Sequence, residues 1–448
     1  MKPWGGPPWS AADALVGFRP KAGQGTGRGP GGPPHKPCQP HTRKGYNQPV
    51  SFAASSPVDA ETAQAGAGRA LAGFLLSGFL LALLGAILPA WGYHRDPPDF
   101  LTVGNYFLCV AAGLAASFKP ARYLMARRGL PFLLVFACLL ACASLVYLAL
   151  VSPPASAWWR AAGLLVLGAA AGMLNMALFQ AVSWTYHADA AGAFTRGGIW
   201  YGLGCLAATL VAIGAFYGYN VTITLALMAV APVVFAGIYY RSSYTAAAAG
   251  AQPTLRQAFA DFRSLGAVLF ALLLFFQSGN EWSIAGWLPL FLIRRVGMSP
   301  QGALRILALY WIFLMAGRLG AIAVLPRVRH GRLLLGSVLS ALFGCLILYS
   351  TKTGFGAVSG VFFVGAGYAS VYPLVSEAIG RRFPYYHPGL FNGIFSLALL
   401  GGLLAPATLG YAANQWGVGV VIGIPLAGTC MAMVLILAIR LETKVTGR

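Results

Sequence analysis

The sequence predicts an all-α integral membrane protein that crosses the bilayer twelve times. Of its 448 residues, 58% are hydrophobic and only 9% are charged, whereas soluble domains carry about 25% charged residues. After residue 69 the apolar residues form long runs, and runs of about 20 apolar residues are typical of transmembrane helices. A soluble protein of this length could not cover its surface with so few charged side chains.

Residues 1–69 differ in composition from the rest of the chain. The stretch GGPPWSAADALVGFRPKAGQGTGRGPGGPPHKPCQP is rich in Gly and Pro and has no hydrophobic periodicity. Such a segment cannot bury enough apolar surface to fold. It also lacks the charged start and short apolar run of a signal peptide. We therefore expect a disordered tail over residues 1–69.

Twelve helices are expected after this tail, each long enough to cross the bilayer. At about 1.5 Å per residue, about 20 residues cross a hydrocarbon core of about 30 Å. The expected ranges are 70–93, 101–118, 131–151, 161–184, 197–218, 221–240, 264–293, 302–325, 333–350, 355–379, 390–412 and 419–440. Within the seventh range, Ser278, Gly279 and Asn280 can break the helix and expose backbone groups to a substrate.

The basic residues predict the orientation of the chain. An even number of spans places both termini on one side of the membrane. After residue 69, the loops and the C-terminus on that side carry seventeen Lys or Arg residues, and the opposite loops carry six. By the positive-inside rule, both termini are cytoplasmic, in a plasma (bacterial inner) membrane. The formal net charge of +21 is therefore a topology signal, and we expect no nucleic-acid partner.

The chain divides into two similar halves around its longest internal polar stretch, 241–263, which we expect to be a central cytoplasmic loop. The halves, 70–240 and 264–448, each hold six expected spans. The tripeptide GIW at 198–200 opens the fifth span, GIF at 393–395 opens the eleventh, and glycine-rich helix follows both. The loops KPARYLMARRGLP and PRVRHGRLL occupy the same place in each half and are both basic. Two related halves are typical of secondary transporters.

These features are similar to those of the major facilitator superfamily over residues 70–440. The segments GNEWSIAGWLPLFL, GYASVYPLVSEAIG and HPGLFNGIFSLALLGGLLAP resemble its fucose:proton symporter branch, which includes sugar permeases. The resemblance implies two pseudo-symmetric six-helix bundles and secondary transport. The loop motif departs from the usual G-x-L-x-D-R-x-G-R, because ARYLMARRG and LPRVRHG lack its acidic residue. The first and fourth spans also lack the acids that fucose permeases use, so fucose itself and that coupling chemistry cannot be carried over.

Glu281 is the candidate coupling residue. It lies near the middle of the seventh span, where a charge costs at least about 2.5 kcal/mol, and such residues usually face a water-filled cavity or a partner. Gln277 lies one helical turn before it and points the same way. The alternative is a structural acid that is buried neutral or paired with Arg318 of the eighth span. Glu377 and Arg381 are spaced i,i+4 at a helix end, so we interpret them, with Arg318, as gating or structural residues.

The expected substrate cavity is rich in aromatic and amide side chains. No Lys or Arg lies near the middle of a span, so an anionic solute would lack a counter-charge. We expect a neutral, hydroxyl-rich solute such as a monosaccharide. The candidate substrate-binding residues are Gln277, Asn280, Asn175, Gln180, Trp200, Tyr201, Tyr310, Trp311, Tyr368, Tyr372 and Asn392.

Three functions are compatible with these residues. The first is a secondary active sugar transporter coupled to a proton or sodium ion, and the second is an efflux or exchange carrier for an amphipathic solute. The third is a membrane-embedded enzyme of the glycosyltransferase type, which would need acids or a metal cluster beside a large polar loop. Cys138 and Cys142 share one helix face, where helix packing is the simpler interpretation than metal binding. We therefore expect a monomer that is not an enzyme and has no cofactor or metal.

Overall fold

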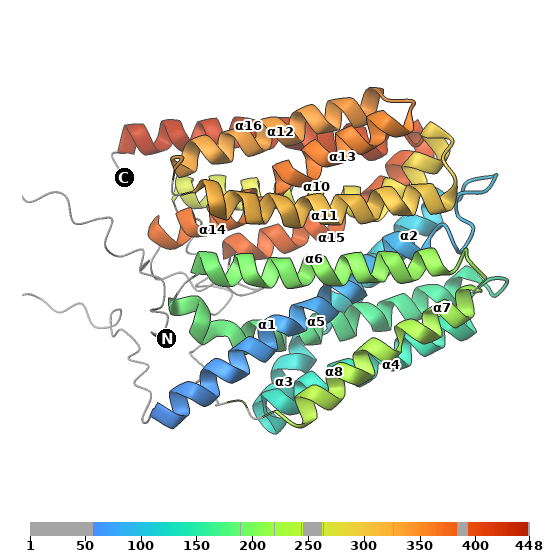
Figure 1. Cartoon of the computed structure of the whole chain (residues 1–448), viewed down its shortest axis with the longest axis horizontal. Coiled ribbons are helices and arrows are strands. Elements are labelled where there is room, and N and C mark those ends of the chain that lie inside the picture. The colour runs from blue at the N-terminus through green and yellow to red at the C-terminus, as the bar shows by residue number, and fades with distance from the viewer. Residues whose placement is uncertain are drawn as a thin grey trace, which may run out of the picture. The chain divides into compact units, whose positions relative to one another are not determined.

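The computed structural model describes residues 57–188, 190–218, 220–242, 244, 262, 264–325, 327–382 and 393–446, and every regular element in them is a helix. The first half holds α1 (Pro57–Ile87), α2 (Phe100–Ala116), α3 (Phe118–Arg128), α4 (Leu130–Leu150), α5 (Ala157–Ala188), α6 (Ala190–Gly214), α7 (Val221–Met228) and α8 (Val230–Tyr240). The second half holds α10 (Leu265–Phe291), the π-helix η3 (Leu292–Val296), α11 (Pro300–Val324), α12 (His330–Ser350), α13 (Gly354–Ala369), α14 (Val371–Arg382), α15 (Gly393–Trp416) and α16 (Val420–Thr446) (Figure 1).

Twelve segments of the described chain are long and apolar enough to cross a membrane, which confirms the predicted number. The protein is therefore an integral, multi-pass membrane protein. Three spans consist of two consecutive α-helices, and a fourth, Leu265–Val296, consists of α10 and the π-helix η3. The break lies at Ser117 between α2 and α3, at Ala229 between α7 and α8, and at Ser370 between α13 and α14. In all three cases the residue at the break keeps right-handed helical backbone angles, so the chain continues in the same span.

The start of α1 differs from the predicted tail boundary. The apolar span begins at Gly68, close to the expected residue 70, but the helix itself begins at Pro57. Proline is favoured in the first helical turn, and the following sequence, VDAETAQAGAGRA, is rich in good helix formers. Residues 57–69 therefore extend the first span as helix, because intrinsic propensity continues the helix beyond the apolar run.

The seventh span also differs from expectation, since α10 runs through Ser278, Gly279 and Asn280 without a break. A Cβ atom at Gly279 would lie 3.3 Å from the backbone oxygen of Gly401 on α15. The glycine therefore allows two helices to pack closely, a use that leaves the backbone hydrogen bonds of α10 intact.

The two halves repeat the same helix pairings. In the first half α1 packs against α6, α2 against α5, α4 against α5 and α4 against α8. The corresponding spans of the second half pair in the same way, with α10 against α15, α11 against α13, α12 against α13 and α12 against α16. Contacts between the halves are symmetric as well, because α2 meets α15, α6 meets α11 and α1 meets α10. This pattern confirms a pair of pseudo-symmetric bundles.

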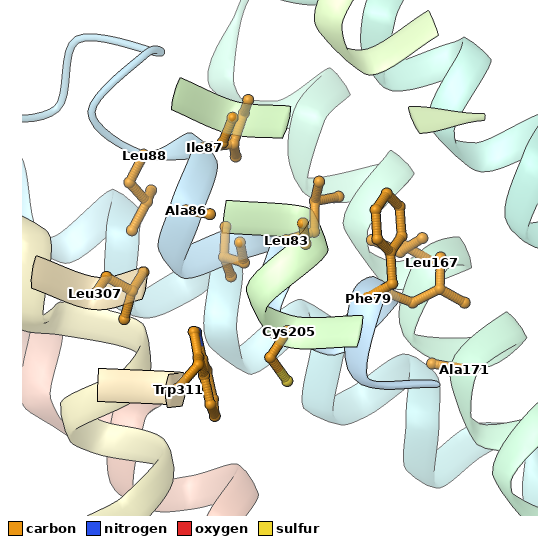
Figure 2. Packing of buried hydrophobic residues seen from close by; sticks show 14 of the residues in the cluster. Phe79, Leu83, Ala86, Ile87, Leu88, Leu167, Ala171, Cys205, Leu307 and Trp311 are labelled. Atoms are coloured by element: carbon orange, nitrogen blue, oxygen red, sulfur yellow. The ribbon is translucent and has the colours of Figure 1, made fainter. Parts of the chain in front are cut away.

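The apolar core continues across the interface between the halves. Figure 2 shows Leu83 of α1, and Leu88 directly after the end of that helix, in the same cluster as Cys205 of α6 and Trp311 of α11. All four are at most 3% exposed. We call the end of the protein where α1 joins α2 the α1–α2 end, and the other the opposite end. The start of α1 and the end of α16 both lie at the opposite end (Figure 1).

Candidate functional site

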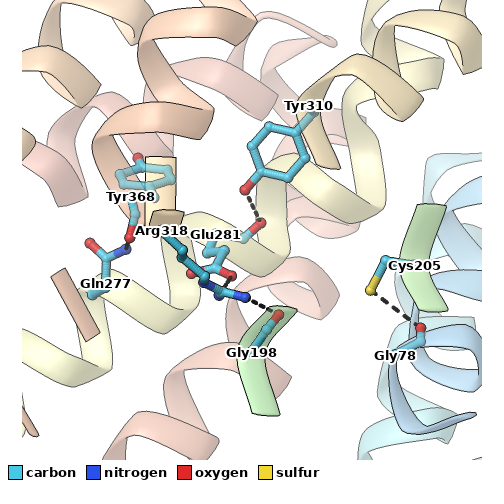
Figure 3. A network of polar contacts seen from close by, with 8 residues as sticks. All are labelled: Gly78, Gly198, Cys205, Gln277, Glu281, Tyr310, Arg318 and Tyr368. Atoms are coloured by element: carbon cyan, nitrogen blue, oxygen red, sulfur yellow. Dashed lines mark hydrogen bonds and ion pairs between the residues drawn. The ribbon is translucent and has the colours of Figure 1, made fainter. Parts of the chain in front are cut away.

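Glu281 lies between the two halves, beside a buried arginine. Its Oε1 is 3.7 Å from Nη2 of Arg318 on α11, and the two side chains are 14% and 9% exposed. Nη1 of the same guanidinium donates a hydrogen bond to the backbone oxygen of Gly198 on α6 (Figure 3). One cation therefore joins the acid of the second half to the main chain of the first half.

Tyr310 and Trp311 precede Arg318 by about two turns of α11. The Tyr310 hydroxyl donates to the backbone oxygen of Glu281 at 3.5 Å (Figure 3), and the Tyr310 ring meets the Trp311 ring edge-on at 5.1 Å. Both aromatic residues are at most 3% exposed. They fix α11 against α10 at the height of the acid, which keeps Glu281 and Arg318 facing each other.

A small cavity adjoins Glu281 at the interface of the halves. Water-sized molecules can place their centres in about 30 Å³ of it, and one water needs about 10–15 Å³ on this measure. The cavity is therefore too small for a monosaccharide in this conformation. Its walls come from α1, α2, α6, α10, α11 and α15, and its lining residues are Leu81, Ala82, Leu84, Gly85, Phe107, Val110, Tyr201, Glu281, Trp282, Ala285, Gly286, Trp311, Gly402, Leu403 and Pro406.

Three of the predicted site residues line this cavity, namely Glu281, Tyr201 and Trp311. Sequence reasoning missed Trp282, whose ring lies 6.3 Å from the ring of Tyr201 across the interface. The pattern in the sequence that could have identified Trp282 is the helical spacing of its neighbours. Trp282, Ala285 and Gly286 share one face of α10. The small residues lie one turn after the tryptophan, where they leave space beside its large ring.

Gln277, Asn280 and Tyr368 lie in a polar network inside the second half. Nε2 of Gln277 donates to the backbone oxygen of Tyr368 at 3.4 Å (Figure 3), and Nδ2 of Asn280 donates to Oγ1 of Thr429 at 3.3 Å. The Tyr368 hydroxyl lies 2.7 Å from the same Oγ1. These contacts join α10 to α13 and α16, and all three predicted residues are at most 5% exposed. None of the three lines the cavity beside Glu281.

The remaining predicted binding residues are spread over both halves. Oδ1 of Asn175 accepts from Ser77 at 2.8 Å, which joins α5 to α1. Trp200 is 39% exposed on α6, and Gln180 and Tyr372 are partly buried on α5 and α14. Asn392 lies outside the described residues. None of the described four lines the cavity.

The predicted Glu377–Arg381 pair forms at the opposite end. Glu377 also lies 3.2 Å from Nε2 of His330 at the start of α12, so it joins α14 to α12. Nearby, Arg382 of α14 pairs with Glu442 of α16. These contacts hold the end of the tenth span within the second half.

At the α1–α2 end, polar contacts cross between the halves. Nη1 of Arg294 lies 2.5 Å from Oδ1 of Asp96 and donates to the backbone oxygen of His94 at 3.4 Å. Tyr411 of α15 donates to Asn105 of α2. Burial, together with the positive charges of Arg95 and Arg294, lowers the pKa of His94. At this end the two halves are therefore joined by an ion pair and by hydrogen bonds.

A buried arginine in the first half was not foreseen as a structural centre. Nε of Arg160 donates to the Tyr106 hydroxyl at 2.9 Å, and Nη2 donates to the Tyr93 hydroxyl at 3.1 Å. The two phenol oxygens lie 2.7 Å apart, and the guanidinium lies 5.7 Å from the Trp91 ring. Arg160 is only 6% exposed, and it anchors the loop after α1 to α2 and α5.

No group of three His, Cys, Asp or Glu side chains in the described part of the chain is placed to hold a metal ion. The cavity is lined by the carboxyl group of Glu281 and by four aromatic rings, those of Phe107, Tyr201, Trp282 and Trp311. The guanidinium of Arg318 lies beside Glu281 but does not line the cavity.

No protein-family model and no curated protein matches the sequence. Solved structures do match. A variant of the nucleoside transporter NupG is 15% identical with a TM-score of 0.65, over 83% of this chain and 99% of that one. The major facilitator superfamily transporter FucP in its outward conformation is 14% identical with a TM-score of 0.58, over 84% and 99%. A variant of the Escherichia coli fucose:proton symporter FucP gives the same values. The expected resemblance is confirmed at the level of the fold, and the chain has the fold of major facilitator superfamily transporters, including that of the fucose symporter branch.

Proposed function

We propose that this protein is a secondary active transporter that moves a small neutral polar solute, namely a sugar, by proton symport with alternating access. One observation carries the proposal: Glu281 lies in a cavity between two pseudo-symmetric halves, within 3.7 Å of Arg318. The similar structures are named as transporters, which supports a transport protein over an enzyme.

Glu281 suits the coupling role because its surroundings change when the halves move. In the conformation described here it faces a cavity with room for only about two waters. Parting of the halves would expose it to bulk water. A carboxyl group binds a proton with different affinity in these two environments, and only such differential binding lets a pH gradient shift a conformational equilibrium.

The cavity walls and the structural neighbours support a solute that contains a sugar ring. NupG is named as a nucleoside transporter and FucP as a fucose:proton symporter. Aromatic side chains with a few convergent polar groups are typical of small-molecule sites. A second candidate is a carrier for an amphipathic solute, and the mostly apolar lining, with Glu281 as its one carboxylate, favours it.

Uptake by the full chain in proteoliposomes tests the proposal. Monosaccharides, nucleosides and amphipathic cations would first be screened by thermal shift, and the ligands that stabilise the protein would then be offered with and without an imposed pH gradient. We expect accumulation of a neutral sugar-containing solute only with the gradient, and loss of this accumulation in Glu281→Gln, with exchange retained. Glutamine keeps the hydrogen-bonding capacity of the side chain but cannot ionise.

A matched pair of variants locates the site. Trp282→Ala should abolish the ligand-induced thermal shift, whereas Leu272→Ala, at a residue 37% exposed outside the cavity, should leave it unchanged. Accumulation by Glu281→Gln equal to that of the wild type would overturn the coupling role. A thermal shift given only by amphipathic cations would favour the second candidate.

The proposed setting is the plasma (bacterial inner) membrane, with a monomer whose termini are cytoplasmic. The α1–α2 end would then face the outside. Cysteines placed at Arg95 and at Leu441 lie at the two ends of the protein. A membrane-impermeant maleimide added to intact cells should label the first and spare the second, and the reverse result would invert the orientation.

A further inference from the structure

The guanidinium of Arg318 is a buried cation that contacts both halves of the protein. The residue is 8% exposed, and its guanidinium lies between the carboxylate of Glu281 on α10 and the backbone oxygen of Gly198 on α6 (Figure 3). We infer that Arg318 is the positioning residue through which the charge of Glu281 controls the contact between α6 and α11. A deprotonated Glu281 holds the two helices together, and a protonated one releases them. The inference rests on the proposed function in that Glu281 changes its protonation state.

The geometry of α6 is suited to this contact. A Cβ atom at Gly198 would lie 2.7 Å from Nη1 of Arg318 and 3.0 Å from its Cζ, so an alanine there would displace the guanidinium from its present place against the main chain. One turn later, a Cβ atom at Gly202 would lie 2.7 Å from Cγ of Met315, which precedes Arg318 by one turn on α11. Two glycines thus let α11 approach α6 along the length of this contact.

The electrostatics give the contact its dependence on charge. Nε of Arg318 has no hydrogen-bond partner among the described residues, so the buried cation depends on the carboxylate of Glu281 and on one carbonyl group. Removing one member of a buried ion pair leaves an uncompensated charge, which is strongly unfavourable. Once Glu281 is protonated, the guanidinium is better solvated by water than by the carbonyl alone. Water can reach it only if α6 and α11 part.

Other ionisable groups near Glu281 do not replace it as the sensor. Those that face it are Tyr201 and Cys205 from α6, and Arg318 and Tyr310 from α11. The residues that line the shared cavity from α1, α2 and α15 are not ionisable. Tyrosine, cysteine and arginine ordinarily titrate above pH 8. Among these groups, a conformational change driven by acid below pH 8 therefore reports on the carboxyl group of Glu281 alone.

The test measures the separation of the halves as a function of pH. Spin labels would be placed at Tyr123 on α3 and Leu441 on α16, which are 55% and 64% exposed in different halves at the opposite end. The distribution of distances between the two spin labels would be measured by double electron–electron resonance, with the full chain in nanodiscs, from pH 5 to pH 8. In the wild type we expect a short distance to dominate at pH 8 and a longer one at pH 5.

Gly198→Ala is the decisive variant, because it leaves Glu281 and Arg318 in place but blocks the approach to the α6 backbone. We expect its distance distribution to be long and independent of pH. Gly320→Ala, on the same helix as Arg318 but with no atom within 4 Å of the new Cβ, is the matched control and should respond as the wild type does. Arg318→Lys keeps the charge without the planar fork that reaches two partners, and it should also lose the pH response. Arg318→Lys provides the test if Gly198→Ala does not fold.

Each outcome distinguishes this inference from the proposed function. A normal pH response in Gly198→Ala or in Arg318→Lys overturns the role of Arg318, even if Glu281→Gln abolishes accumulation. A pH response that persists in Glu281→Gln shows another sensor and also overturns it. If the response is lost in all three variants while Glu281→Gln still accumulates substrate, the contact stands and the coupling role fails.

Discussion

A Cβ atom on Gly410 of α15 would lie 2.4 Å from Cα of Gly104 on α2, so these two helices touch through their backbones. The contact lies at the α1–α2 end and joins the first half to the second. Backbone atoms cannot move aside as a flexible side chain can. A larger residue could be accommodated only by separation of the helices, so this contact limits how large the residue at position 410 can be when that end is closed.

We therefore predict that Gly410→Ala opens the α1–α2 end. Overpacking costs about 1–3 kcal/mol, which corresponds to about a 5- to 150-fold change in the ratio of open to closed molecules. A cysteine introduced at Ala285, which lines the cavity, should react faster with a maleimide in this variant. Gly336→Ala on α12, where the new Cβ has no atom within 4 Å, is the control and should leave the rate unchanged. Equal rates in both variants would contradict the prediction.

The Asp96–Arg294 pair should matter much less for closure. Although the atoms lie 2.5 Å apart, the Asp96 side chain is 83% exposed, and exposed ion pairs contribute about 0–1 kcal/mol. Asp96→Asn should raise the same labelling rate less than about fivefold at low salt and leave it unchanged at high salt. The double variant Asp96→Arg with Arg294→Asp should restore the original rate. A larger effect than that of Gly410→Ala would reverse this ranking.

Acid should weaken the α1–α2 end through His94. Burial and the charges of Arg95 and Arg294 lower its pKa in the folded protein, so the unfolded chain binds a proton more readily. Stability is then complete above the ordinary histidine pKa of about 6.5 and falls as the pH drops below it. Thermal unfolding of His94→Gln should depend less on pH between 5 and 7 than that of the wild type. The same slope in both proteins would exclude His94 as the cause.

The buried Arg160 cluster should stabilise the first half. Tyr106→Phe removes a partner of Nε and leaves a buried donor unsatisfied, which costs about 1–3 kcal/mol. The melting temperature should fall by several degrees. Tyr349→Phe removes a hydroxyl from a residue that is 48% exposed on α12 and should have no measurable effect. The comparison separates the loss of this buried hydrogen bond from the general effect of removing a tyrosine hydroxyl group.

The sequence was sufficient to predict the twelve spans because long apolar runs have few alternative structures. It also identified Glu281, since a charge within such a run stands out regardless of its neighbours. The side-chain environment of α10 could not be predicted in the same way. Gln277 and Asn280 turn toward α13 and α16, and Trp282 turns toward the cavity. The rotation of a helix about its axis is decided by the neighbouring helices, and a span that is apolar on every side carries no amphipathic pattern to reveal it.

The Gly279 position illustrates the same limit. Ser-Gly-Asn in a span is compatible with a broken helix or with a close helix crossing, and the local sequence is the same in both cases. The partners in this crossing are Gly401 and Ala405, which lie on α15 more than one hundred residues later. Only the tertiary structure brings Gly279 against these two residues.

The small volume of the cavity beside Glu281 has a consequence for any measured affinity. If the closed conformation cannot hold the substrate, the apparent dissociation constant equals the intrinsic one divided by the fraction of molecules that are open. A protein that spends most of its time closed will therefore have a high apparent dissociation constant even when its open site fits the solute well. A variant that closes less readily would show tighter equilibrium binding together with slower turnover, and an inhibitor selected against such a variant would be selected for the open form.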